Sequence, residues 1–434
     1  MDGIAMNYLK NRLALTAICG MMLAYITLNY LSHQLTSTLT DPALTLYLSA
    51  SAVNWILWGI LLYSITNEQA SNWSLSQILI IALGVRLFSI TTAPLVTTDY
   101  FRYLWDGFHF AQFGSPYLHA PAMYFDDLTL PDVIKDLLAD INYPSVPTIY
   151  GPTLQYIFLL AYWLKPVSLL TLKIIFIIFD LISIRLLARI AQPRWVLAYA
   201  LCPLLIMEIS VNAHADIIGA TLLLASCVYL RRTFVKSSAI CLALAIGAKL
   251  IAVVVAPFIL LKLPKRTWNY FALTLLILYC PFILLHHTEF AALQQFLSQW
   301  EFNSSGFAVL KLIVDAQYAR YIAALLIMIS AIWYGYRYQH RYEIPRGDWL
   351  LGIFFLLAPV LNPWYYIWLL PFAALYPSLW AWAGAALIAL SYVNGEYSLT
   401  LQLAPFHHPE WLRPLEFLPI LLLVIYEKLR RPLK

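Results

Sequence analysis

The chain has 434 residues, of which 62% are hydrophobic and only 11% are charged, and its formal net charge is +5. Since a soluble domain carries about 25% charged residues, this composition excludes an ordinary cytosolic enzyme, a disordered chain and a secreted disulfide scaffold. The basic residues are dispersed along the sequence, which excludes a nucleic-acid partner. The composition therefore predicts an all-α polytopic membrane protein in contact with a lipid bilayer.

Apolar runs of spanning length occur throughout the chain, at 13–31, 43–65, 76–96, 168–190, 194–211, 213–230, 268–285, 318–336, 379–394 and 414–427. Two longer runs, 237–261 and 349–376, are interrupted by Ala248-Lys249 and by Asn362-Pro363, so each is expected to form a pair of helices. The run 153–166 is too short to span and predicts a re-entrant or interfacial segment. Together these runs predict one membrane-embedded domain over residues 1–434, with about 12–14 transmembrane helices.

The basic residues predict the orientation of these helices. If the N-terminus is cytoplasmic, 18 of the 27 Lys and Arg residues fall on the cytoplasmic side, as the positive-inside rule requires. Four of these 18 are in the C-terminal tail, namely Lys428, Arg430, Arg431 and Lys434. Both termini are then cytoplasmic, and the loops at about 97–152, 286–317 and 395–413 lie on the external face. Apolar spacing in 131–138 predicts a helix that lies in the interface plane or packs on its own loop.

The first external loop opens with a charged triplet. Asp99, Arg102 and Asp106 are separated by three and four residues, which places them on one face of a helix. A carboxylate there could take a proton from a hydroxyl nucleophile, and the cation could neutralise a phosphate leaving group. The alternative is a structural cluster of surface ion pairs, which is common.

Further polar residues return to the same external side. Glu208, Asn212, His214 and Asp216 lie where two apolar runs meet, and such groups are costly unless they are paired or face an aqueous cavity. His214 and Asp216 could also bind a metal, but two candidate ligands do not make a site, so a divalent metal is possible without being indicated. Lys249 either snorkels to the headgroups or neutralises a bound anion.

The last candidate site residues are amide and aromatic side chains on the predicted external side, namely Trp300, Asn303, Asn362, Trp364 and Tyr365. Trp and Tyr at such positions most often belong to interfacial belts. Taken together with the acids and Lys249, however, they predict one external cavity whose aromatics suit a sugar and whose cations suit a phosphate. Arg86, inside a span, is expected to snorkel or to pair with Asp180.

The order of the motifs resembles a known superfamily. TTDYFRYLWDGFHFAQFGSPYLHAP followed by INYPSVPTIYGPTLQYIF resembles the first-loop signature of integral-membrane glycosyltransferases of the GT-C superfamily, closest to bacterial mannosyltransferase-like members that use a polyprenyl-phosphate sugar. EISVNAHADIIGA, GAKLIAVVVAPFIL, WEFNSSGFAVL and LNPWYYIWLLP are similar to later motifs and follow in the expected order, over about residues 84–372. His109 and Gly151 depart from the commonest pattern, at positions that bear on the acceptor and the sugar.

The resemblance implies a GT-C-like bundle with interfacial helices in a long first external loop. It also implies inverting transfer of a hexose, mannose in the first instance, from a polyprenyl-monophosphate donor to a glycan, glycolipid or protein acceptor on the non-cytoplasmic face. The expected location is a bacterial inner membrane, with the active site on the periplasmic or extracellular side. No nucleotide or obligatory metal is implied.

By motif position the general base falls on Asp99. We expect Asp106 and Arg102 to orient this carboxylate, and Arg102 with Lys249 to hold the donor phosphate. Donor sugar and phosphate contacts are expected from the remaining candidates, which are Tyr103, Glu208, Asn212, His214, Asp216, Trp300, Asn303, Asn362, Trp364 and Tyr365. His214 and Asp216 would line the acceptor or sugar pocket.

Two other interpretations share many of these features. A transporter or flippase of a lipid-linked saccharide would have the same spans and intramembrane Lys, although transporters are often built from inverted repeats and the chain has no two corresponding halves. A related enzyme could use glucose, arabinose or an aminosugar instead of mannose. A purely structural subunit would not explain so many polar groups on one face.

Overall fold

The computed structural model describes residues 2–35, 39–65 and 73–430. Within these ranges the chain is helical and contains no strand, apart from an isolated bridge between Phe302 and Val360. The predicted all-α class is therefore confirmed. Arg431 and Lys434, two of the basic residues used for the predicted orientation, lie outside the described residues.

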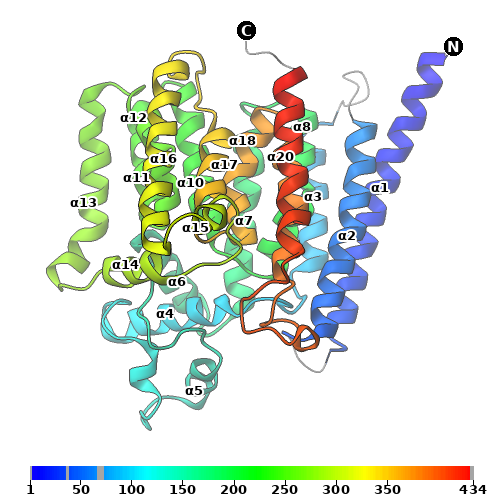
Figure 1. Cartoon of the computed structure of the whole chain (residues 1–434). Coiled ribbons are helices and arrows are strands. Elements are labelled where there is room, and N and C mark those ends of the chain that lie inside the picture. Colours follow the sequence, from blue (N-terminus) through cyan, green and yellow to red (C-terminus); the bar gives the residue numbers. More distant parts are fainter. Residues whose placement is uncertain (1, 36–38, 66–72, 431–434) are drawn as a thin grey trace. The chain divides into compact units, whose positions relative to one another are not determined.

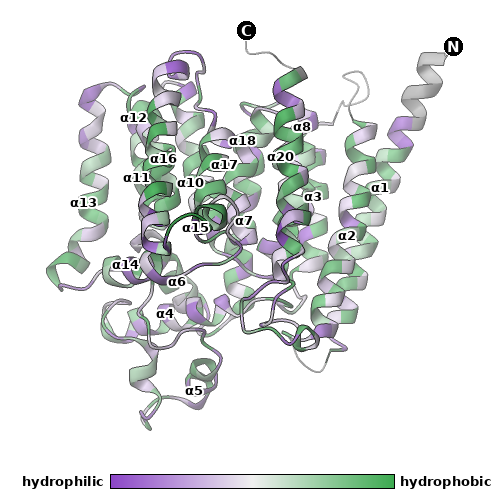
Figure 2. Ribbon diagram, in the orientation of Figure 1, coloured by the Kyte–Doolittle hydropathy of each residue, from purple (hydrophilic) through white to green (hydrophobic). Residues whose placement is uncertain are grey.

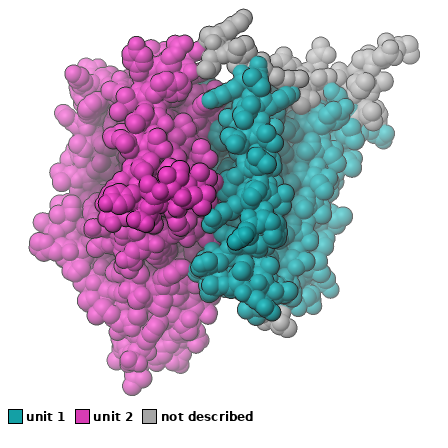
Figure 3. Space-filling view, in the orientation of Figure 1, with its two compact units in different colours: residues 1–96, 180–212, 361–434 teal, residues 97–179, 213–360 magenta. Residues whose placement is uncertain are grey.

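The chain divides into two compact units, each built from separate stretches of sequence (Figure 3). Unit 1 comprises 1–96, 180–212 and 361–434, and unit 2 comprises 97–179 and 213–360. Helix α7 (Leu169–Leu187) carries the chain from unit 2 into unit 1. The other helices of unit 1 are α1 (Asp2–Ser32), α2 (Asp41–Ser64), α3 (Leu75–Ser89), α8 (Pro193–Ala200), α9 (Pro203–Leu205), the π-helix η3 (Ile206–Val211), η6 (Pro363–Tyr365), α18 (Tyr366–Leu375), α19 (Leu379–Leu387), η7 (Ile388–Tyr392), η8 (Leu399–Leu401) and α20 (Leu412–Arg430).

Unit 2 holds the long first loop and the central helices of the sequence. Its elements are α4 (Asp99–Phe113), η2 (Pro121–Tyr124), α5 (Asp132–Ala139), α6 (Pro152–Leu164), α10 (Asp216–Arg231), α11 (Val235–Ala248), η4 (Leu250–Val254), α12 (Ala256–Leu260), η5 (Lys265–Thr267), α13 (Trp268–Leu284), α14 (Phe290–Gln299), α15 (Gly306–Lys311), α16 (Ala316–Tyr338) and α17 (Gly347–Leu357). In Figure 1, α10, α11, α13 and α16 run upright and α4 lies across one end of them.

The long helices indicate a membrane protein. Within the described ranges, four helices are long and apolar enough to cross a membrane, and five if the bent pair Pro193–Ala200 and Pro203–Val211 counts as one span. Figure 2 shows that α2, α13 and α16 are hydrophobic over most of their lengths. Shorter apolar helices occur at Leu75–Ser89, Val235–Ala248, Gly347–Leu357 and Leu379–Tyr392. The predicted number of 12–14 spans stays a prediction.

The interruptions predicted from the sequence are confirmed. Helix α11 ends at Ala248, and Lys249 adopts an extended conformation before η4 begins. The second long run breaks between α17 and η6, where Pro363 is the first residue of the new helix and cannot donate the backbone hydrogen bond that would continue the old one. Helix α6 has only 13 residues, as expected for a segment too short to span.

The short helix predicted at 131–138 is confirmed as α5. Ile134, Leu137 and Leu138 are buried on one side of α5, whereas Val133 is exposed. The apolar face therefore packs inward, on unit 2 itself, which is the second of the two alternatives that the sequence left open.

Unit 1 contains the buried ion pair between Arg86 and Asp180. The Arg86 Nε atom lies 2.5 Å from Asp180 Oδ2, and both side chains are fully buried. Arg86 Nη1 also donates to the carbonyl of Ala200, at the end of α8. The predicted pairing is confirmed, and because both groups are buried, removing either one would leave an uncompensated charge.

Candidate active site

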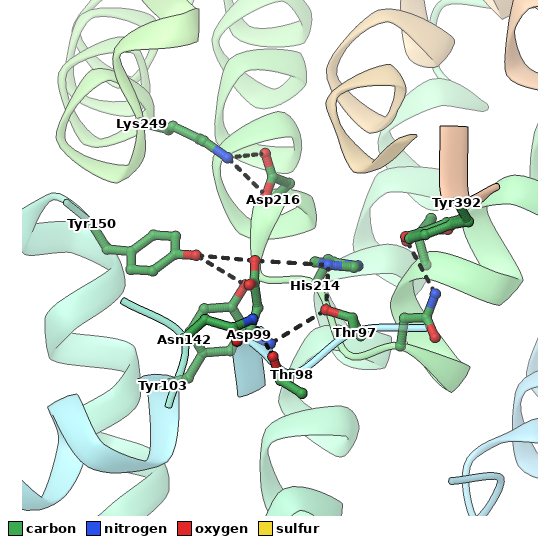
Figure 4. A network of polar contacts seen from close by, with 12 residues as sticks. Thr97, Thr98, Asp99, Tyr103, Asn142, Tyr150, His214, Asp216, Lys249 and Tyr392 are labelled. Carbon is green, nitrogen blue, oxygen red and sulfur yellow. Dashed lines mark hydrogen bonds and ion pairs between the residues drawn. The ribbon is translucent and has the colours of Figure 1, made fainter. Parts of the chain in front are cut away.

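Asp99 lies at the centre of a group of polar side chains that belong to unit 2, among them Thr97, Tyr150 and His214 (Figure 4). It is the first residue of α4, and its side chain is 26% exposed. Its Oδ2 atom accepts a hydrogen bond from the Tyr150 hydroxyl at 3.4 Å and lies 4.0 Å from His214 Nε2. Thr97 Oγ1 lies 3.4 Å from the same His214 nitrogen and accepts a hydrogen bond from the Asp99 backbone N–H. A positioned, accessible carboxylate of this kind can accept a proton from a substrate.

The surroundings of Asp99 alter its acidity in opposing directions. Burial raises the pKa of this carboxyl above its ordinary value, and His214, Lys249 and the Tyr150 hydroxyl lower it, while the nearby carboxylate of Asp216 raises it. The net effect is a raised pKa. A carboxylate whose pKa is raised toward working pH is a stronger base than an ordinary surface aspartate.

A buried ion pair lies beside this carboxylate. Lys249 Nζ donates to Asp216 Oδ1 at 2.9 Å and to Oδ2 at 3.2 Å. The Asp216 side chain is almost fully buried, whereas that of Lys249 is 16% exposed. Asp216 and Asp99 are the first residues of α10 and α4, and the positive end of a helix dipole favours a negative charge there. The structure thus provides Lys249 with a protein partner that the sequence analysis did not identify.

The backbone next to Tyr150 passes close to the end of α11 because residue 151 is a glycine. A Cβ atom on Gly151 would lie only 2.2 Å from the carbonyl oxygen of Gly247. Gly247 stands two residues before Lys249, at the end of α11. The contact therefore joins the loop that carries Tyr150 to the helix end that carries Lys249. The Tyr150 hydroxyl also lies 3.4 Å from that of Tyr103.

The backbone before His214 is strained. Ala213 has a φ of 62° and is fully buried, and a left-handed conformation is unfavourable for any residue with a Cβ atom. Strain of this kind persists where the surrounding structure enforces it, and it concentrates at functional sites. Here it turns His214, which is also fully buried, toward Thr97 and Asp99.

Arg102 and Asp106 have different partners from those expected. Arg102 donates to the backbone carbonyls of Val146, Asn142 and Tyr143 at 3.0–3.1 Å, rather than to the Asp99 carboxylate. Arg102 therefore holds the loop 142–146, which leads to Tyr150.

The Asp106 carboxylate is buried. Its Oδ2 atom accepts hydrogen bonds from Thr148 at 2.6 Å and from Gln155 at 2.8 Å. Burial raises the pKa of Asp106 to about 6, although Arg102 and these two hydrogen bonds lower it. This carboxylate thus connects α4 with the start of α6.

The predicted residues Glu208 and Asn212 belong to unit 1. Glu208 lies in the π-helix η3 and is fully buried. Its carboxylate accepts hydrogen bonds from Tyr47 at 2.6 Å, from Tyr392 at 3.0 Å and from the Asn212 side chain at 3.4 Å. These donors satisfy the buried charge within the unit.

The remaining predicted residues are placed as follows. Trp300 and Asn303 belong to unit 2, where the Trp300 ring packs on that of Tyr143 and Asn303 is buried with a φ of 49°. Asn362, Trp364 and Tyr365 belong to unit 1, at the start of η6. Their assignment to a donor site stays a prediction.

Several side chains of the network were not predicted from the sequence, namely Thr97, Thr98, Asn142, Thr148, Tyr150 and Gln155. Tyr150 stands directly before Gly151 in the motif TIYGP, so an aromatic residue next to a glycine in the first loop was the available signal. In the part of the chain that the structure describes, no group of three or more His, Cys, Asp or Glu side chains is arranged to hold a metal ion.

Comparison with protein families identifies the class of enzyme to which the chain belongs. A family model described as alpha-(1->6)-mannopyranosyltransferase, N-terminal domain, matches residues 16–265, which is more than half of the chain. The chain belongs to this mannosyltransferase family. The matched segment includes Asp99, Tyr150, His214, Asp216 and Lys249. No curated protein and no solved structure matches the chain.

The family membership confirms the resemblance to GT-C-like mannosyltransferases. The chain is therefore a glycosyltransferase that transfers mannosyl groups, and it requires a sugar donor and an acceptor. This favours the enzyme over the transporter considered from the sequence.

Proposed function

We propose that the enzyme transfers mannose from a polyprenyl-monophosphate donor to a hydroxyl group of a glycan, glycolipid or protein acceptor, with inversion at the anomeric carbon. The tail of such a donor lies in the bilayer and its phosphate at the interface. Support comes from the apolar helices that could span a membrane and from the position of Asp99 at the start of α4, outside those helices.

In the proposed reaction, Asp99 takes the proton of the acceptor hydroxyl as its oxygen attacks the anomeric carbon. The bond between that carbon and the phosphate oxygen breaks, and the polyprenyl phosphate leaves with the bonding electrons. The observation that carries this assignment is a partly exposed carboxylate held by buried partners, Tyr150 and His214. A base held in this way needs little reorganisation during the reaction.

Lys249 is our candidate for the leaving phosphate. Its ammonium group is partly exposed and is held by both oxygens of Asp216. A cation in a partly desolvated site stabilises the charge that develops on a departing phosphate more strongly than it would in water. Asp216 then keeps the ammonium in place between turnovers, and no obligatory metal is part of this proposal.

We place the site on the external face of a bacterial inner membrane, with both termini in the cytoplasm. This orientation is supported by the 18 Lys and Arg residues that fall in the inside turns and the tail, because positive charges accumulate on the cytoplasmic side. Labelling of single cysteines introduced in the loop 97–152 by a membrane-impermeant reagent should succeed on intact spheroplasts.

The donor class can be tested directly. The purified protein in nanodiscs receives either polyprenyl-phosphate [14C]mannose or GDP-[14C]mannose, with octyl α-mannoside as the acceptor. The proposal predicts labelled disaccharide from the lipid donor alone. Label transferred from the nucleotide donor and not from the lipid would refute it.

A further inference from the structure

Two aromatic side chains from separate loops of unit 2 pack together. The rings of Tyr143 and Trp300 have centroids 4.1 Å apart and an interplanar angle of 39°. Tyr143 is 41% exposed and Trp300 is partly exposed. The pair therefore presents a partly exposed aromatic surface.

The backbones of both residues are held by arginines. Arg102 donates to the carbonyl of Tyr143 at 3.0 Å, and Tyr143 has a left-handed φ of 51°. Arg320 donates to the carbonyl of Trp300 at 3.1 Å and to that of Leu297 at 2.9 Å. Two guanidinium groups and a strained backbone thus fix one aromatic pair, and strain of this kind concentrates at functional sites.

Asn142 connects the aromatic pair to the segment that carries Asp99, the proposed base. The Asn142 side-chain amide donates to the hydroxyl of Thr98, the residue that directly precedes Asp99. Figure 4 shows Asn142, Thr98 and Asp99 side by side. Arg102, one turn after Asp99 on α4, also binds the carbonyl of Asn142.

This combination matches the chemistry of a sugar ring. An aromatic ring offers apolar contact for the C–H face of a pyranose, while amide and hydroxyl groups bind its hydroxyls. An interfacial belt also uses Trp and Tyr, but a belt residue needs neither a left-handed backbone nor an arginine on its carbonyl group. The position next to the base is where an acceptor hydroxyl must arrive.

We propose that Tyr143 and Trp300, together with Asn142 and Thr98, form the subsite that binds a pyranose ring of the acceptor. The inference rests on the proposed role of Asp99, because it assigns the sugar on this surface to the acceptor and not to the donor. The surface would hold the ring whose hydroxyl points toward Asp99.

The test measures binding separately from catalysis. Octyl α-mannoside is titrated into the nanodisc-embedded protein and its dissociation constant is measured by saturation-transfer NMR, without donor. We expect Trp300→Ala and Asn142→Ala to weaken binding about tenfold, and Trp300→Phe, which retains a ring, to keep most of it. Trp333→Ala, which removes an exposed aromatic on α16, is the matched control and should bind like the wild type.

Transfer assays with the same variants identify the sugar. A rise in the acceptor KM with an unchanged donor KM supports the subsite. Unchanged acceptor binding in a folded Trp300→Ala protein, or a rise confined to the donor KM, would overturn it. If binding depends on Trp300 while the wild type transfers no mannose from the lipid donor, the subsite stands and the proposed donor does not.

Discussion

We predict that widening the contact between Gly151 and Gly247 reduces the rate of mannosyl transfer, although neither glycine belongs to the polar network around Asp99. A Cβ atom on Gly151 would meet the Gly247 carbonyl oxygen at 2.2 Å and its carbon at 3.0 Å. Since nonbonded atoms prefer about 3.5 Å, the two backbones must separate by roughly 1 Å. The φ of Gly151 is −72°, which alanine adopts without strain, so Gly151→Ala tests this separation alone.

The separation displaces Tyr150 relative to Lys249. A misplacement of about 1 Å can reduce a rate by about 100-fold, which corresponds to about 2.7 kcal/mol of barrier. We therefore expect Gly151→Ala to lose about two orders of magnitude in kcat for mannosyl transfer, with a melting temperature that still shows a folded protein. Gly59→Ala is the control, because a Cβ atom there meets nothing within 4 Å.

The assay follows transfer from polyprenyl-phosphate [14C]mannose to octyl α-mannoside at saturating concentrations of both. A folded Gly151→Ala enzyme that retains more than half of the wild-type kcat would show that the glycine contact does not set the site geometry. A loss of activity in Gly59→Ala equal to that in Gly151→Ala would show that any added methyl group perturbs the fold.

Three further predictions concern protonation. Because the Tyr150 hydroxyl lowers the pKa of Asp99, Tyr150→Phe should move the acid limb of the kcat/KM pH profile to higher pH; an unmoved limb would contradict this. Lys249 lowers the pKa of Asp99 and Asp216 raises it. Lys249→Met should therefore move the acid limb to higher pH, and Asp216→Asn should move it to lower pH. Shifts of the same sign would refute the assignment. Burial raises the pKa of Asp106 from 3.8 to about 6, so the folded protein holds this proton more tightly than the unfolded chain does. The resulting contribution to the free energy of unfolding is present at low pH and is lost as the pH rises through 6. Thermal unfolding in detergent should therefore show Asp106→Asn gaining about 2 kcal/mol of stability relative to the wild type between pH 4.5 and 7.5, and a constant difference would exclude this titration.

Much of the site was predictable because its residues stand at helix ends. Asp99 follows an apolar run, and His214 and Asp216 lie between two such runs, so their sequence positions alone place polar groups at one end of the predicted helices. Lys249 was recognised because it interrupts an apolar run. The structure brings these four residues together in unit 2.

Their partners were not predictable, because they depend on contacts distant in sequence. Lys249 pairs with Asp216, 33 residues earlier. Glu208 is satisfied by Tyr47 and Tyr392, which are 161 and 184 residues away. A pattern shows that a buried charge needs a partner, but only the packed fold shows which one.

The partners of Arg102 were not predictable either, although they are closer in sequence. Its spacing from Asp99 and Asp106 correctly predicted a helix over these residues. A guanidinium group has five N–H donors, however, and can bind carbonyls as well as carboxylates. The loop 142–146 returns over α4 and presents three carbonyls to Arg102, and the path of that loop is not encoded in the spacing of the triplet.

In the proposed reaction, Asp99 is the general base of mannosyl transfer. The most direct measurement compares wild type and Asp99→Asn in single-turnover transfer from polyprenyl-phosphate [14C]mannose to octyl α-mannoside, with donor binding measured on the same samples. We expect Asp99→Asn to bind the donor within about twofold of the wild type and to transfer mannose at least about 100-fold more slowly. An Asp99→Asn enzyme that binds the donor normally and transfers at the wild-type rate would contradict this role.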